Sequence, residues 1–199
     1  MSPKPMPRIA ARSIAGGMLL MAGFTLIWAG IASSALPSPL SIPAIVAFGT
    51  LSLLVGFGGA QLLLASGKFP AHSSQADRAQ SKRIGIAYGA IFGTEALLIG
   101  GASGIITATH HDAYLIPTIG LIVGLHFYPM AKVFHRTIDY YLATWVCSVA
   151  LSSMIMLSQG KITTPTASIV VSLATATATS IYGLYMLRLE QRAIRSLTR

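Results

Sequence analysis

The chain has 199 residues, of which 53% are hydrophobic and only 10% are charged, and its mean hydropathy is +0.68. Soluble domains carry about a quarter charged residues, so this composition excludes an ordinary water-soluble domain and indicates a protein that lipid solvates. The formal net charge of +9 does not indicate a nucleic-acid binder, because the basic residues form small groups between hydrophobic stretches rather than one continuous basic face.

Six stretches are apolar enough to cross a bilayer, for which a helix needs about 20 residues. The longest connection between them runs from about residue 67 to 83, which leaves no room for a separate soluble domain. The sequence therefore predicts an all-α integral membrane bundle of six transmembrane helices, one domain over residues 1–199 with short basic cytoplasmic tails at 1–12 and 188–199. The predicted spans are Ser13–Leu36, Ile42–Ser66, Ile84–Ala108, Tyr114–Phe134, Tyr140–Ser158 and Pro165–Leu187.

The basic residues predict the orientation of these spans. Of the 14 Lys and Arg residues, only Lys161 falls on the side opposite to the rest. Since cytoplasmic loops carry an excess of Lys and Arg, both termini are expected in the cytoplasm. The residues on that side are Lys4, Arg8, Arg12, Lys68, Arg78, Lys82, Arg83, Lys132, Arg136, Arg188, Arg192, Arg195 and Arg199.

The amino-terminal stretch has a second interpretation, as a cleaved signal peptide. Basic residues, an apolar run and the small cluster Ala32-Ser33-Ser34-Ala35 are typical of such signals. The apolar run is longer than the usual 7 to 15 residues or so of a signal, and this favours a retained span. Cleavage would leave the later spans oriented the same way.

Turn and capping residues separate the next spans. Pro37, Pro39 and Pro43 suit the short outer turn after the first span, because proline lacks the donor that a helix interior needs. In the inner loop, Ser74 with Asp77 fits a capping box, so the third helix is expected to begin in the cytoplasm.

Small residues recur at helical spacing in the third, fourth and sixth spans, as is typical of packed membrane helices. We expect these stripes to serve packing within the bundle rather than a dedicated oligomer interface. They comprise Gly85, Gly89, Gly93, Ala96, Gly100 and Gly104; Gly120 and Gly124; and Ser168, Ser172, Ala176 and Ser180.

Glu95 is the one acid deep in a predicted span, near the expected midplane of the bilayer. An ionised side chain there costs about 2.5 to 3.5 kcal/mol on insertion scales, so it needs a partner or a water-filled cavity. One interpretation is a proton- or cation-binding carboxylate on a transport path. The other is a neutral Glu that bonds to a neighbouring helix and has a structural role.

His126 is the predicted partner, because it lies midway along the fourth span and imidazole titrates near neutrality. Pro129 frees the carbonyl of Leu125 beside it. If the pair is an ion or proton site, Glu95 and His126 should lie within hydrogen-bonding distance around a polar cavity. A histidine that only fixes helix contacts is the alternative.

Three other patterns are weaker. His110, His111 and Asp112 combine metal-ligand types, but neighbours on a turn rarely converge, so a solvated helix cap is favoured. Cys147 is expected to be a small packing residue. Ser103 lies in a G-x-S-G string that resembles rhomboid proteases, yet the sixth span lacks the histidine such a serine needs. Neither a metal nor a cofactor is indicated, and an enzyme is not favoured.

The run Gly124-Leu125-His126-Phe127-Tyr128-Pro129-Met130-Ala131 resembles a G-L-H-F-x-P-x-A motif. This motif ends the fourth helix in a group of small bacterial six-span membrane proteins of unknown function. The resemblance implies a bacterial inner-membrane location and brings no activity.

The carboxy-terminal arginines Arg188, Arg192, Arg195 and Arg199 repeat at the spacing of one helical face. Such a segment could contact an anionic inner leaflet, or the sixth helix could simply continue into water.

Two functions stay open at this point. One is a small proton- or cation-coupled transporter or channel-like subunit with Glu95 as the ion site, in which two inverted three-span halves would place the site at the midplane. The other is a non-transporting scaffold, sensor or assembly factor whose arginines contact lipid. Such a protein could associate with a second copy or with a partner subunit.

Overall fold

Six long helices joined by short turns make up the described chain. The computed structural model describes residues 7–71 and 75–195, without the side chains of residues 76, 77, 193 and 195. Each helix contains a segment that is long and apolar enough to cross a membrane, which confirms the predicted all-α six-helix bundle. The elements are α1 (Arg8–Ala35), α2 (Ser38–Ala65), η1 (Ser66–Lys68), α3 (Gln75–Ala108), η2 (Asp112–Tyr114), α4 (Leu115–Phe134), α5 (Thr137–Ser158) and α6 (Thr164–Arg195).

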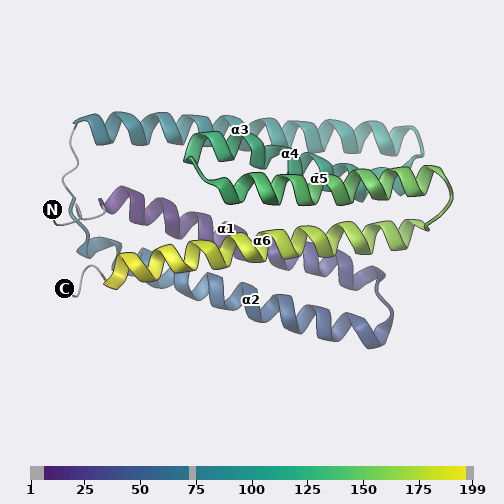
Figure 1. Ribbon diagram of the computed structural model, residues 1–199, viewed down its shortest axis with the longest axis horizontal. Helices are drawn as coiled ribbons and strands as arrows, with labels where there is room; N and C mark the ends of the chain where they lie inside the picture. The colour runs from purple at the N-terminus through teal and green to yellow at the C-terminus, as the bar shows by residue number, and fades with distance from the viewer. Residues whose placement is uncertain (1–6, 72–74, 196–199) are drawn as a thin grey trace.

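Several helices are longer than the apolar spans that predict them. α1 begins at Arg8, within the predicted basic tail, and α6 continues as one helix to Arg195 (Figure 1). The start of α1 is held to the segment between α2 and α3, because Arg8 donates a hydrogen bond of 2.9 Å to the carbonyl oxygen of Gly67. The predicted capping box at Ser74 lies outside the described residues.

The helices form two layers (Figure 1). α3, α4 and α5 make one layer, while α1, α2 and α6 make the other. α6 joins the layers, because it packs on α1 and α2 as well as on α4 and α5. The start of α1 and the end of α6 lie at the same end of the bundle, as an even number of antiparallel helices requires.

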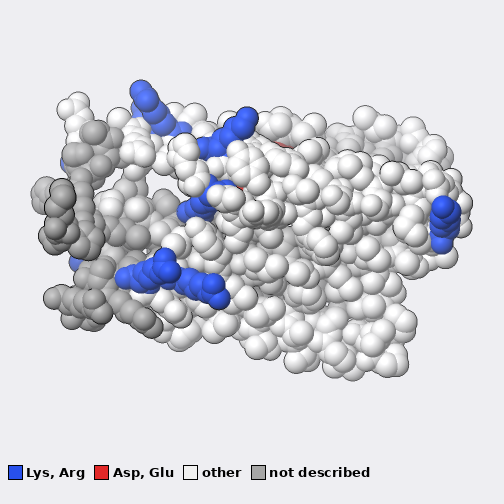
Figure 2. Space-filling model, viewed as in Figure 1, with Lys and Arg blue, Asp and Glu red and all other residues white. Residues whose placement is uncertain are grey.

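The positions of the charged side chains agree with the alternating direction of the helices. On the face shown in Figure 2, Lys and Arg side chains gather toward the end where the described termini lie and reappear only at the opposite extreme, with an uncharged belt between. The turn between α5 and α6, which contains Lys161, lies at that opposite end. Lipid tails can contact such a belt, because almost no charged side chain on it would have to leave water.

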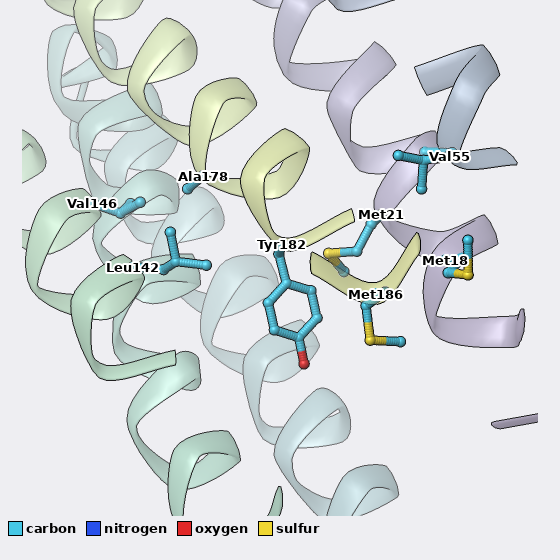
Figure 3. Close-up of a cluster of buried hydrophobic side chains, with 9 residues drawn as sticks. Met18, Met21, Val55, Leu142, Val146, Ala178, Tyr182 and Met186 are labelled. Atoms are coloured by element: carbon cyan, nitrogen blue, oxygen red, sulfur yellow. The ribbon is translucent and has the colours of Figure 1, made fainter. Parts of the chain in front are cut away.

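The largest buried cluster surrounds Tyr182 on α6 (Figure 3). Tyr182 lies between Leu142 of α5 and Met21 of α1, and Val55 of α2 packs close by. Gly183 allows that approach, because a Cβ there would lie 2.9 Å from a methyl carbon of Val55. This cluster holds the two layers together.

Not every small-residue stripe serves internal packing. A Cβ added at Gly124 of α4 would lie 2.7 Å from the sulfur of Cys147, so this glycine does bring α4 and α5 together. In α3, a Cβ added at any of the five glycines of the stripe meets no described atom within 4 Å. The prediction of internal packing is therefore wrong for α3, because α3 packs mainly on α4 and turns its glycines outward. These glycines are Gly85, Gly89, Gly93, Gly100 and Gly104.

The two halves of the chain share a contact pattern. α1 and α2 form a packed hairpin, and so do α4 and α5, which run in the opposite directions. The third helix of each half packs on the first helix of the other half, α3 on α4 and α6 on α1. The correspondence is partial, because α6 lies at the centre while α3 lies at the edge (Figure 1).

Candidate functional site

Glu95 lies on the face of α3 that packs on α4. Tyr88, Phe92, Glu95 and Ile99 share this face because their spacing matches the helical repeat. The ring of Tyr88 contacts Phe134, and that of Phe92 lies 5.4 Å from His126, so the face is aimed at α4. The glycine stripe lies beside it, which explains why Glu95 is buried while the glycines are open.

The structure brings Glu95 and His126 together. Their carboxylate Oε1 and imidazole Nδ1 atoms are 3.3 Å apart, and the two side chains are 9% and 8% exposed. The contact does not meet hydrogen-bond geometry, and neither ring nitrogen of His126 has a hydrogen-bond partner among the described residues. The contact is therefore a close electrostatic pair whose atoms stay free to exchange a proton or to bind another group.

Aromatic rings enclose the imidazole. His126 stacks on Phe127 with ring centroids 4.3 Å apart, and the tilted ring of Phe92 of α3 also lies close to it. α4 continues without a break through Pro129. The carbonyl of Leu125 that Pro129 frees was expected beside the imidazole, yet it makes no hydrogen bond to it.

A partly open cavity of about 260 Å³ adjoins the pair. Side chains of α1, α3, α4 and α6 line it, and most of them are apolar. The ion-site hypothesis expects a polar cavity, whereas this one is mainly apolar: beside Glu95 and His126, the polar side-chain groups of the lining are the hydroxyl of Thr179 and the indole N–H of Trp28. The other lining residues are Met21, Phe24, Ile27, Trp28, Ile31, Ile99, Ile116, Ile119, Val123 and Phe127.

Thr179 belongs to a second buried polar contact, between α1 and α6. The hydroxyl of Thr25 donates a hydrogen bond of 2.9 Å to the hydroxyl of Thr179, and both residues are 2% exposed. This pair lies at the α1–α6 interface, whereas Glu95 and His126 lie at the α3–α4 interface. Each of the two corresponding helix pairs thus carries one buried polar contact at the cavity.

Asp139 is a functional candidate that the sequence did not single out. Its side chain is fully buried, and neither carboxylate oxygen has a hydrogen-bond partner among the described residues. Arg136 and His126 act on it electrostatically, and the hydroxyl of Tyr182 lies close enough to stabilise its ionised form. Arg136 instead donates a hydrogen bond of 2.8 Å to the hydroxyl of Tyr182. A buried carboxyl whose oxygens make no contact of full hydrogen-bond geometry is costly, which makes Asp139 a candidate for a role beyond packing.

The turn between α3 and α4 has the features of a solvated cap. His110 has a φ of 56° and ends α3 in the left-handed region. The exposed His111 ring lies 2.7 Å from the carbonyl oxygen of Thr109, which accepts a hydrogen bond from the Nδ1–H tautomer. Asp112 starts η2. Within residues 7–71 and 75–195 no three His, Cys, Asp or Glu side chains are grouped as metal ligands.

The remaining predicted residues are dispersed. Cys147 is buried in the notch that Gly124 leaves, and Ser103 lies on α3, away from the buried pair. Arg188 and Arg192 are exposed on the last turns of α6. The side chain of Arg195 and all of Arg199 lie outside the described part of the chain.

Comparison with known protein families, curated proteins and solved structures finds no match to this chain. The fold and the site define its class, a multi-pass α-helical membrane protein. Its distinguishing feature is a buried carboxylate–imidazole pair beside a mainly apolar cavity.

Proposed function

We propose that this protein is a small secondary transporter that exchanges protons for monovalent cations at Glu95 and His126. The observation that carries the proposal is the buried pair, 3.3 Å from oxygen to nitrogen, beside a partly open cavity. An acid inside a membrane bundle marks an ion pathway by default, because burying it without a function is expensive.

The chemistry of the pair supports one positive charge at a time. An ionised Glu95 beside a neutral His126 leaves one uncompensated negative charge in a low-dielectric interior, which is unfavourable. A proton on His126 compensates it, and so does a cation in the cavity. Both together would leave an excess positive charge, so cation binding favours release of the proton.

Asp139 extends the site toward the basic end of the bundle. With a helical rise of about 1.5 Å per residue, Asp139 lies about 9 Å closer to that end than His126. A buried carboxyl at this position suits a proton carrier between His126 and the inner surface. Arg136, which lies at the start of α5, would keep cations from following the same route.

The arrangement of helices also supports transport. Transporters with inverted repeats place their sites near the midplane, where the two repeats meet. Here α3 packs on α4 as α6 packs on α1, and the cavity is lined from all four of these helices. Rocking of one three-helix set against the other would open the cavity to either side in turn.

The proposed location is a bacterial inner membrane, with the basic end and both termini in the cytoplasm. The positive-inside rule and the G-L-H-F-x-P-x-A resemblance support this placement. The exposed Arg188 and Arg192 would then reach anionic headgroups at the inner leaflet. The open glycine face of α3 leaves room for a second copy or a partner subunit.

Flux measurements with a matched pair of variants test the function. The parent protein, Glu95→Gln and Glu190→Gln are reconstituted in liposomes that hold a pH-sensitive dye, and outward proton flux is recorded after external cations are added. Glu190 is the control because it is also a buried acid, but lies on α6 away from the cavity. We expect cation-driven proton flux in the parent and in Glu190→Gln, and its loss in Glu95→Gln. No flux in the parent, or equal flux in all three, would overturn the proposal and favour the non-transporting scaffold.

A further inference from the structure

The cavity beside Glu95 has too few oxygen atoms for an inorganic cation. Metal cations such as Ca²⁺ take about six to eight oxygen ligands, and Mg²⁺ takes six. Among the lining side chains only Glu95 and Thr179 offer oxygen. The hydroxyl of Thr179 is already committed, because it accepts from Thr25 and donates within α6 to the carbonyl of Thr175 or Ala176. A desolvated metal ion would thus have one carboxylate and little else.

The aromatic lining suits a different kind of cation. Phe24 and Trp28 of α1 and Phe127 of α4 line the same cavity as Glu95. The face of an aromatic ring attracts a cation by about 0.5 to 2 kcal/mol, and more strongly where water is excluded. An organic cation carries its charge on an apolar body and needs no oxygen ligands. It would therefore be satisfied by one carboxylate and several rings.

Size and access limit the ligand further. The volume of about 260 Å³ is slightly below the 300 to 1,000 Å³ or so of typical ligand pockets, so the ligand must be small. α1 and α3 make at most marginal contact in the described chain, which leaves the cavity unsealed between them. Ile27 lines the cavity and is 57% exposed at the surface of α1, within its apolar span. The opening therefore faces lipid rather than water.

We propose that the cavity binds a small organic monocation with an apolar body, of the quaternary ammonium type, which enters from the bilayer between α1 and α3. The proposal rests on the proposed exchange function and adds the class of substrate. In the bound state the cationic centre lies between the Glu95 carboxylate and the ring of Trp28, and the apolar body lies against the isoleucines. His126 is neutral in that state, because the ligand takes over the positive charge.

The surroundings of the pair contain few other groups that could alter this balance. Tyr88 on α3 and Asp139 on α5 are the further titratable side chains that act on Glu95 and on His126, respectively. α1 and α6 contribute only apolar residues and Thr179 to the described lining. Binding should therefore weaken as the pH falls, because protons then compete for the same carboxylate–imidazole pair.

Equilibrium dialysis of the protein in nanodiscs tests the substrate class. The probe is benzyltrimethylammonium, and neopentylbenzene is the neutral molecule of the same shape; empty nanodiscs correct for partition into lipid. We expect saturable binding of the cation alone, weakened about tenfold or more by Glu95→Gln, since 1.4 kcal/mol corresponds to a factor of ten. Trp28→Leu should weaken it about fivefold, within the range of one cation–π contact. Glu190→Gln should leave the affinity unchanged.

Each outcome separates this inference from the transport function. Equal binding of both probes, or cation binding that Glu95→Gln does not change, would overturn the organic-cation site. If the probe does not bind while sodium or potassium drives Glu95-dependent proton flux, the exchange function stands and the substrate class is wrong. If the probe binds through Glu95 but no cation drives proton flux, the site is real and the transporter proposal fails.

Discussion

The bundle buries the side chains of Glu95 and Asp139 in different surroundings. Glu95 could be found from the sequence, because it lies near the middle of an apolar stretch and His126 lies at a similar depth in the next one. Asp139 could not, because the apolar stretch that follows it begins at Tyr140. The turn between α4 and α5 is only two residues long, and this pulls Asp139 into the first turn of α5 and into the interior.

Asp139→Asn separates a role in proton transfer from a structural role. Neither carboxylate oxygen makes a contact of full hydrogen-bond geometry with the described residues, so an uncharged amide of the same shape should lower the thermal unfolding temperature in detergent only slightly. We expect cation-driven proton flux to fall about 100-fold or more, the effect typical of losing one general acid–base group, with organic-cation binding unchanged. A large loss of stability with unchanged flux would assign Asp139 to structure alone.

The Thr25–Thr179 contact offers a second measurement on single residues. Hydroxyl contacts between membrane helices contribute about 0.6 kcal/mol on average. Thr25→Val, Thr179→Val and the double variant form a cycle whose coupling energy we expect near that value, measured by unfolding in mixed micelles. Additive single effects would show that the 2.9 Å contact does not couple α1 to α6.

Among the helices, the glycines of α4 and α3 differ in what surrounds them. In Gly124→Ala the new methyl group would lie 3.0 Å from the backbone nitrogen of Cys147, which cannot move aside as a side chain can. We expect a loss of about 1 to 3 kcal/mol in unfolding free energy, the usual cost of overpacking. The matched variant Gly93→Ala meets no described atom and should be neutral or stabilising by up to about 1 kcal/mol. Equal losses in both variants would contradict the described packing of α3.

Helix positions follow from hydropathy, whereas the roles of the helices do not. The six spans were predictable because about 20 consecutive apolar residues have few alternatives to a membrane helix. Capping and spacing signals indicated the polar extensions: the expected cap at Ser74 precedes the start of α3 at Gln75, and the continuation of α6 past Arg188 was one of the two alternatives. The cavity was not predictable, because it exists only where α1 and α3 fail to close on one another, and that depends on packing between distant segments.

For the whole molecule, the basic end defines the predicted orientation. Gln159 and Gln191 are exposed near opposite ends of the bundle, and the native Cys147 is buried. In intact cells, a membrane-impermeant maleimide should label Gln159→Cys at once and Gln191→Cys only after permeabilisation. The parent protein, which has only Cys147, gives the background. The reverse labelling would place the basic end outside and contradict the positive-inside assignment.

Exchange of one proton for one monovalent cation is electrically neutral. The voltage dependence of the flux tests this claim most directly. Cation-driven proton flux through the parent protein is measured in liposomes at zero and at −100 mV, with Glu95→Gln as the background. Moving one uncompensated charge across 100 mV changes the free energy by about 2.3 kcal/mol, or roughly 50-fold in the equilibrium. Our account predicts the same Glu95-dependent flux at both voltages. A flux that changes with voltage, or that persists without Glu95, would contradict a site that holds a single positive charge.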